Sequence, residues 1–403
     1  MEETEYLEER LEEVTIEKSG LRSAYAVAFT CMIAFMGIGL VDPILKTIAQ
    51  QLDATPAQTT LLFTSYMLVT GIMMLFTGFI SSRIGAKKTL IFGLIIIITF
   101  SCLAGFSETI NGLIYLRAGW GLGNALFIST ALSTIVGVLA GQTEKAIIMY
   151  EASMGLGMAI GPLLGGLLGS MSWRLPFFGV ATLMFIATLA IGFLLSPIAK
   201  PKKKIALFAG ISALKNHKLR SVGIIALLYN FGFFTLLAYA PFLLEGFSEM
   251  QVGFVFFGWG ALLAVASVFI APILEKRINT YRTIILALFF FLMCLAFIGY
   301  NAQTPGLVAF GVIMAGLFQG LINTLLTTIA MEIPDLERSV ASSSYSFIRF
   351  FGGAIAPFVA GKLAEIWNSS VTFYFAAIMV LIGLVFVVVH NQYFATEEEY
   401  ETI

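Results

Sequence analysis

Twelve apolar stretches, most of them about 20 residues or longer, run along the chain and are joined mostly by short loops. A helix of 20 residues is about 30 Å long, which is the thickness of the hydrocarbon core of a bilayer. The expected spans are residues 23–47, 60–82, 88–107, 110–140, 145–170, 174–197, 220–244, 251–275, 283–300, 305–331, 339–366 and 370–390. Only 12% of the residues are charged, against about 25% in soluble domains. The sequence therefore predicts an all-α protein that crosses a membrane twelve times.

The positions of the lysines and arginines indicate how these spans are oriented. Most of the 23 fall on one side of the membrane when the N-terminus is placed in the cytoplasm, as the positive-inside rule requires. Both termini are then cytoplasmic. The expected parts are an acidic tail (1–22), a six-helix bundle (23–197), a basic cytoplasmic linker (198–219), a second six-helix bundle (220–391) and an acidic tail (392–403). The first tail has leucines at helical spacing, and a short amphipathic helix and a solvated segment both fit it.

A glycine-dense segment with a central proline occurs twice in the chain. Residues 155–166 contain Pro162, and a weaker copy at 352–361 contains Pro357, roughly 195 positions later. Same-sense repeats of six helices imply two halves related by a pseudo-two-fold axis along the membrane normal. This duplication is typical of transporters whose halves move against each other.

Four patterns lie in the first half of the chain, and one of them is the glycine-dense segment with Pro162. The loop after the second span has Gly78, Arg83, Gly85, Lys87 and Lys88; the fourth span has Arg117 and Gly121; the fifth has Gly157, Gly161, Pro162, Gly165 and Gly166; the first span contains Asp42-Pro43. Together they resemble the major facilitator superfamily, in particular its twelve-span drug:proton antiporters. The resemblance implies the major facilitator fold, a cytoplasmic gate at the loop motif and an antiporter motif in the fifth span. Ser82 stands where the family's loop motif has an acid.

The first candidate for proton coupling is a pair of charges of equal depth. Asp42 lies roughly 8 Å below the outer end of its span, and Arg117 lies roughly 10 Å in from the same side. We expect Asp42 and Arg117 to form a switchable pair, because protonation of the acid would release the arginine. The resemblance gives Arg117 a proton-coupling role. The alternative is that Asp42 forms a salt bridge with Lys46, one turn away.

Glu151 is the second candidate proton carrier, because it shares the fifth span with the antiporter motif. The alternative is a carboxylate that faces the cytoplasmic vestibule. Arg349 lies near the midplane of the eleventh span, where an arginine needs a carboxylate or several carbonyls. It is expected to pair with Glu151 or Glu332, as part of the mechanism or as a structural charge pair, or to bind an anionic substrate.

The substrate cavity is expected to be apolar and aromatic, since 13% of the residues are Phe, Trp or Tyr. Six side chains at mid-membrane depth are candidates for its lining: Tyr66, Asn124, Asn230, Phe234, Gln319 and Asn323. Packing between helices is the alternative role for each of them.

The predicted function is secondary active export of small amphipathic compounds by alternating access, driven by proton antiport. A nucleotide-binding loop, a metal-ligand constellation and a Ser/His pair are all missing from the sequence, so we expect no enzyme activity, no metal and no cofactor beyond the proton gradient. An exporter of a specific sugar or siderophore, a lipid flippase and a proton-linked uptake carrier stay open. The expected partners are the substrate, protons and the lipid bilayer, without nucleic acid. A monomer in a bacterial or archaeal plasma membrane is expected.

Overall fold

The computed structural model describes residues 2–41, 44–54, 56–139, 141–196, 204–334 and 336–394, and within these ranges it contains helices and turns but no strand. The first seven helices are α1 (Glu2–Gly39), α2 (Leu45–Gln51), α3 (Pro56–Ile84), α4 (Ala86–Gly105), α5 (Ile110–Val138), α6 (Thr143–Gly169) and α7 (Leu175–Leu194). The other elements are α8 (Ala209–Ala213), α9 (His217–Leu243), α10 (Glu249–Val265), the π-helical η2 (Ala266–Ile270), α11 (Ala271–Ile278), α12 (Thr280–Tyr300), α13 (Pro305–Met331), α14 (Arg338–Ile366), α15 (Ser369–Val389) and the 3-10 turn η3 (Asn391–Tyr393).

Twelve stretches of helix in the described part of the chain are long and apolar enough to cross a membrane, which confirms the predicted number. One of them, Met250–Ile278, combines α10, η2 and α11. The predicted first span, 23–47, was wrong in its extent, because α1 ends at Gly39 and α2 begins separately at Leu45. Gly37 and Gly39 weaken the helix at that end, since glycine is a poor helix former.

Polar side chains at the ends of the loops determine where several helices begin. The Thr109 hydroxyl accepts a hydrogen bond from the Gly112 N–H at the start of α5. Asn216, Asn279 and Asn368 cap α9, α12 and α15 in the same way. Such caps satisfy backbone N–H groups that have no partner inside the helix.

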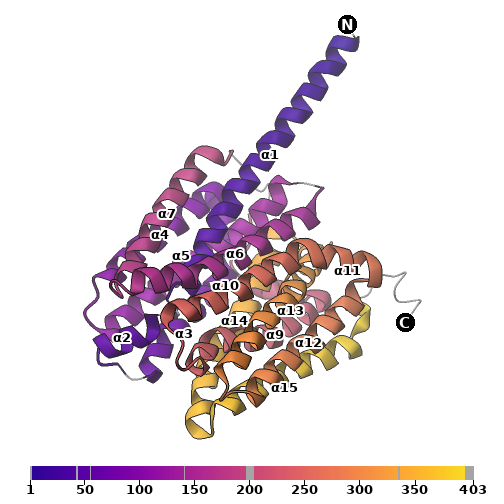
Figure 1. Cartoon of the computed structure of the whole chain (residues 1–403). Helices are drawn as coiled ribbons and strands as arrows, with labels where there is room; N and C mark the ends of the chain where they lie inside the picture. Colours follow the sequence, from indigo (N-terminus) through magenta and orange to yellow (C-terminus); the bar gives the residue numbers. More distant parts are fainter. Residues whose placement is uncertain are drawn as a thin grey trace.

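The acidic N-terminal tail continues the first membrane helix without a break. Helix α1 begins at Glu2, so the tail is helical, and its first turns extend beyond the other helices (Figure 1).

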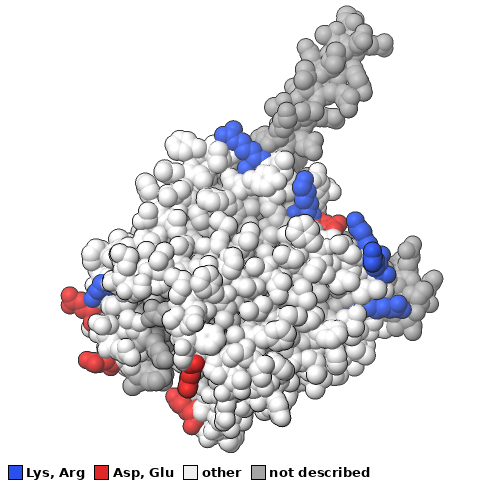
Figure 2. All heavy atoms as spheres, viewed as in Figure 1, with Lys and Arg blue, Asp and Glu red and all other residues white. Residues whose placement is uncertain are grey.

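On the face drawn in Figure 2, most of the charged side chains lie near two opposite ends, and a broad band between them is uncharged. Large apolar side chains are exposed to the surroundings, among them Phe92, Phe185, Phe269 and Ile378. Such a surface is suited to lipid rather than to water.

The two halves of the chain, α1 to α7 and α9 to α15, meet mainly through two helix pairs, α3 with α14 and α6 with α10. Small residues allow the close approach of the second pair. A Cβ added at Gly155 of α6 would lie 2.6 Å from Leu263 of α10, and one at Gly260 would lie 2.7 Å from the Gly155 carbonyl. In a membrane, packing of this kind replaces the hydrophobic effect as the force that holds helices together.

Candidate functional site

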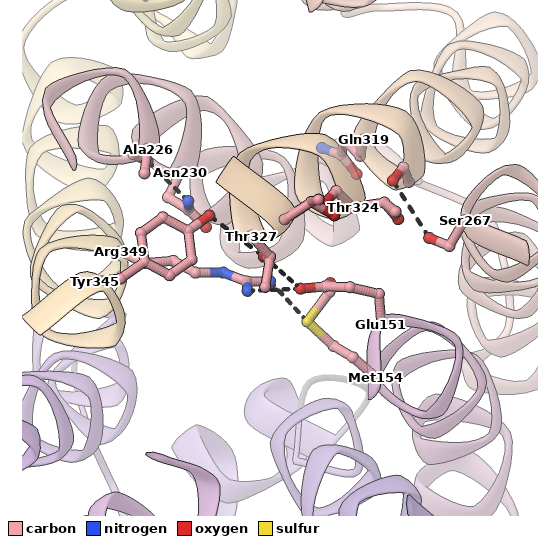
Figure 3. Close-up of polar contacts among 12 residues, drawn as sticks. Glu151, Met154, Ala226, Asn230, Ser267, Gln319, Thr324, Thr327, Tyr345 and Arg349 are labelled. Atoms are coloured by element: carbon pink, nitrogen blue, oxygen red, sulfur yellow. Dashed lines mark hydrogen bonds and ion pairs between the residues drawn. The ribbon is translucent and has the colours of Figure 1, made fainter. Parts of the chain in front are cut away.

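A buried ion pair joins the two halves of the chain. Glu151 lies about two turns from the start of α6 with its side chain 0% exposed, and the side chain of Arg349 on α14 is 6% exposed. Arg349 Nη1 donates to Glu151 Oε1 at 3.1 Å (Figure 3). Because an isolated charge is costly in this environment, each of the two residues makes the burial of the other acceptable.

Three further side chains surround the ion pair. The second guanidinium nitrogen of Arg349 donates to the Met154 sulfur at 2.8 Å, and a thioether is a weak acceptor. Thr327 of α13 donates to Glu151 Oε1 at 2.8 Å, and its hydroxyl oxygen lies 3.4 Å from that of Tyr345 on α14. Figure 3 shows all of these side chains pointing toward one another from α6, α13 and α14.

Sequence reasoning named Glu151 and Arg349 but missed Thr327, Tyr345 and Met154. Hydroxyl and thioether side chains are ordinary in membrane helices, so none of the three is conspicuous alone. A signal was available in the spacing of Gln319, Asn323 and Thr327, since polar residues four apart lie on one face of a helix.

Glu332, the other expected partner of Arg349, lies elsewhere. It is the residue that follows the last turn of α13, and it is exposed at the end of that helix, although part of its side chain is shielded from solvent. Partial burial raises the pKa of its carboxyl, Glu275 and Glu144 raise it further, and Lys218 lowers it. Of the two acids considered for Arg349, the structure brings only Glu151 to it.

The amide candidates of the C-terminal half, Asn230, Gln319 and Asn323, are buried. Gln319 accepts a hydrogen bond from the Trp259 indole, and Asn230 donates to the Ala226 carbonyl at 2.7 Å. Among the described residues, Asn230 Oδ1, Gln319 Nε2 and both polar atoms of Asn323 have no hydrogen-bond partner. Buried amides are usually satisfied, so these atoms are available to a ligand or to water.

Phe234 has a different environment from the amides. Its ring packs against Gly353 of α14, where an added Cβ would lie 2.5 Å from it, and against the rings of Phe233 and Phe350. These contacts hold α9 against α14 within the C-terminal half.

The N-terminal half contains a second buried cation. The Arg117 guanidinium lies 4.5 Å from the Tyr66 ring centre and 4.6 Å from that of Trp120, which are cation–π distances. The Tyr66 hydroxyl and both polar atoms of Asn124 are buried without a hydrogen-bond partner among the described residues. The expected pairing of Arg117 with Asp42 lies outside the described residues, as does the alternative through the Lys46 side chain.

The loop motif contacts the linker between the halves and the end of α7. Arg83 donates to the Ile205 carbonyl at 2.9 Å, and Ser82 accepts from the Ile205 N–H at 3.1 Å. Lys87 donates to the carbonyls of Gly192 and Leu195 at the end of α7, while Lys88 is exposed. Gly85 has a φ of 91° where α4 begins, a backbone conformation that favours glycine.

Another candidate residue of the loop motif lies where α3, α14 and the linker meet. A Cβ added at Gly78 would lie 3.6 Å from both Ile205 and the Ser339 carbonyl.

Three glycines of the antiporter motif face α1 of their own half. Cβ atoms added at Gly157, Gly161 or Gly165 would meet the carbonyls of Met32, Met36 or Leu40. Gly166 is buried on the same helix, as is Pro162. The other half is reached by the Pro162 carbonyl, 3.3 Å from a Cβ added at Gly253 of α10.

Within the described part of the chain, no three His, Cys, Asp or Glu side chains gather as a metal site requires.

The family model described as the Major Facilitator Superfamily matches residues 27–355 and 246–400. The multidrug efflux protein YfmO of Bacillus subtilis (strain 168) is 51% identical over 383 residues, which cover 94% of this chain and 96% of the relative. Multidrug resistance protein 1 of the same organism is 24% identical over 87% of this chain and 92% of its own length.

A solved structure has the same fold. The crystal structure of the human organic anion transporter MFSD10 (TETRAN) superimposes on this structure with a TM-score of 0.74. The superposition includes 91% of this chain and 99% of the transporter's chain. The two sequences are 15% identical, so this likeness concerns the fold alone.

Proposed function

This chain belongs to the major facilitator superfamily, and from that premise we propose that it exports small amphipathic compounds of several kinds in exchange for protons. It is a multi-pass membrane transporter of small molecules and not an enzyme. The name of the 51% identical relative, a multidrug efflux protein from Bacillus, supports efflux as the direction and a bacterial plasma membrane as the location. The chain acts as a monomer and needs no cofactor other than the proton gradient.

The observation that carries the proposal is the ion pair between Glu151 and Arg349. Each residue belongs to a different half, and both are buried. A proton taken up by Glu151 removes the charge that compensates Arg349, which weakens a contact between the halves. Proton uptake thereby favours a different arrangement of the two halves, and this is the requirement for alternating access.

A second coupling site is proposed in the N-terminal half. Arg117 is held between two aromatic rings, and Asp42 is its proposed acid. The buried amides and the Tyr66 hydroxyl are the proposed polar contacts of the substrate, distributed over both halves.

The sign of the charges favours cationic substrates. In antiport, the substrate and the proton must oppose each other, because binding of one has to promote release of the other. A cationic substrate competes with the proton for the ionised Glu151. An anionic substrate would instead pair with Arg349 when Glu151 is protonated, so that proton and substrate would move together. The arrangement therefore suits exchange of a lipophilic cation for protons.

The proposal is tested in vesicles that contain the purified protein and face an imposed pH gradient. We expect uphill movement of ethidium, a lipophilic cation, and its loss in Glu151→Gln. The matched control is Glu365→Gln, since Glu365 forms an exposed ion pair with Lys362 at 2.7 Å. Ethidium movement that is independent of the pH gradient would overturn proton antiport, and gradient-driven transport that survives in Glu151→Gln would overturn coupling through Glu151.

A further inference from the structure

We propose that Thr327 is a positioning residue for Glu151, and that its hydroxyl controls the pH at which the carboxylate exchanges its proton. This inference rests on the proposed function, since it concerns the same carboxylate. Thr327 lies on α13, a helix that contains neither residue of the ion pair, and it is fully buried. Its role would be to act through Glu151 rather than to touch the substrate.

The hydrogen bonds around Thr327 have only one consistent direction when Glu151 is ionised. A threonine hydroxyl has a single proton, and an ionised carboxylate can only accept. Thr327 must therefore donate its proton to Glu151 Oε1, at 2.8 Å. The Tyr345 hydroxyl, 3.4 Å away, is then the donor to Thr327. The result is a chain that runs from Tyr345 through Thr327 to Glu151.

The same chain runs in the opposite direction when Glu151 is protonated. The carboxylic acid then donates to Thr327, and Thr327 donates to Tyr345, without displacement of any heavy atom. Hydroxyl groups rotate easily and serve equally as donors and acceptors. The chain thus stabilises both states of Glu151, but the ionised state gains more, because hydrogen bonds to charged groups are the stronger ones.

The bond from Thr327 has no substitute among the described residues. Two side chains donate to Glu151, Arg349 and Thr327, and both reach Oε1. Oε2 has no partner. The titratable and charged groups that interact electrostatically with Glu151 come from several helices: Arg349 and Tyr345 on α14, Tyr229 on α9 and Tyr150 on α6. Cys31 on α1 interacts with Tyr150, the residue that precedes Glu151 in the sequence.

A neighbouring residue shows what an ordinary threonine does on this helix. The Thr328 hydroxyl donates to the Thr324 carbonyl one turn earlier, at 3.0 Å, and this is the common arrangement inside helices. Thr327 instead reaches across to α6. Thr328→Val is therefore a matched control for Thr327→Val, because it removes a threonine hydroxyl from the same helix without touching Glu151.

The test measures proton release by the purified full-length protein when ethidium is added, over a range of pH. Release falls as pH rises, because a carboxylate that is already ionised has no proton to give. In Thr327→Val the ionised form loses a donor, so we expect the midpoint to move up by about one pH unit, or about tenfold in proton affinity. Thr327→Ser and Thr328→Val should keep the original midpoint. Tyr345→Phe should move it upward by less than Thr327→Val does.

The outcomes separate this inference from the proposed function. If Glu151→Gln abolishes ethidium-dependent proton release while Thr327→Val leaves the midpoint unchanged, Thr327 has no positioning role although proton coupling through Glu151 holds. If Glu151→Gln still releases protons, coupling through Glu151, the observation that carries the proposed function, fails. If Thr327→Val does not fold, the midpoint of proton release is measured in Thr327→Ser and Tyr345→Phe instead. An unchanged midpoint in Tyr345→Phe would contradict the chain of hydrogen bonds from Tyr345 through Thr327 to Glu151.

Discussion

Ser82 Oγ accepts a hydrogen bond from the backbone N–H of Ile205, at 3.1 Å, and thereby attaches the linker between the two halves to the end of α3. The next residue, Arg83, donates to the carbonyl of the same Ile205. Both polar groups of one linker residue are thus held by consecutive side chains of the loop motif. Further along the linker, Ser344 of α14 donates to the Gly210 carbonyl at 2.9 Å. The linker is therefore fixed where α3 of one half meets α14 of the other.

Ser82→Ala is expected to loosen the linker. The substitution leaves the buried Ile205 N–H without its partner, at a cost of about 1–3 kcal/mol. Because the linker contains Lys202, Lys203 and Lys204, limited trypsin digestion reports how often it detaches, and cleavage should be at least about fivefold faster. Ser81→Ala is the control on the same turn. Equal cleavage rates in the two variants would show that the Ser82 bond contributes nothing.

The fold was largely predictable from the sequence, whereas the contacts of the linker were not. Apolar runs long enough to cross a bilayer predict the number of helices, which the structure confirms for the described residues, and a repeat at roughly 195 residues predicts a two-fold arrangement of the halves. The absence of an acid at Ser82 was visible, but its consequence was not. The partner of Ser82 is a backbone N–H more than a hundred positions away, and every residue except proline has such a group.

The candidate site was predictable residue by residue but not as an assembly. Glu151 and Arg349 are conspicuous because charges inside membrane helices are rare. Sequence alone left Arg349 with two possible acids, since depth along a helix does not determine which face the side chain occupies. The spacing of Thr327 from Gln319 and Asn323 marks a polar face of one helix, but the contacts of Thr327 with Glu151 and Tyr345 required the placement of three helices.

Removal of one member of the central ion pair should destabilise the protein, and removal of both should restore most of the stability. Arg349→Met leaves the buried Glu151 carboxylate uncompensated, which costs about 3–5 kcal/mol. The double variant with Glu151→Gln contains no buried charge at this point. Thermal unfolding of the purified protein in detergent measures both effects. Coupled transport should be absent from both variants, so that stability and function separate.

This comparison has a clear opposing outcome. If Arg349→Met unfolds at the temperature of the unmodified protein, the pair is not a buried pair of charges in the membrane. If the double variant is as unstable as the single one, the loss comes from packing and not from an unpaired charge.

Glu332 should make stability depend on pH. Partial burial raises the pKa of its carboxyl, Glu275 and Glu144 raise it further, and Lys218 lowers it. The folded state therefore holds this proton more tightly than the unfolded state, so the contribution of Glu332 to stability is present below its ordinary pKa of 4.5 and is lost as pH rises through the raised value. Glu332→Gln should raise the unfolding temperature at neutral pH, and the difference should vanish toward pH 4.5.

The control for this pH effect is Glu245→Gln, at an exposed acid near the end of α9. It should leave the unfolding temperature nearly unchanged across the same range, because solvent screens exposed charges. A stabilisation of Glu332→Gln that persists unchanged at acid pH would contradict an electrostatic origin.

Gly161→Ala should disrupt the contact between α6 and α1, on which the antiporter motif depends. An added Cβ would lie 2.5 Å from the Met36 carbonyl, and Gly39 already packs against Pro162 at this level, so α1 cannot move aside freely. Gly137→Ala on α5 is the matched control, since a Cβ there would meet nothing within 4 Å. Alanine is favoured over glycine inside a helix by about 1 kcal/mol, so this control should be neutral or slightly stabilising. Thermal unfolding in detergent should therefore move in opposite directions for the two variants, and a Gly161→Ala protein as stable as Gly137→Ala would show that the close approach of α6 to α1 is not required for the fold.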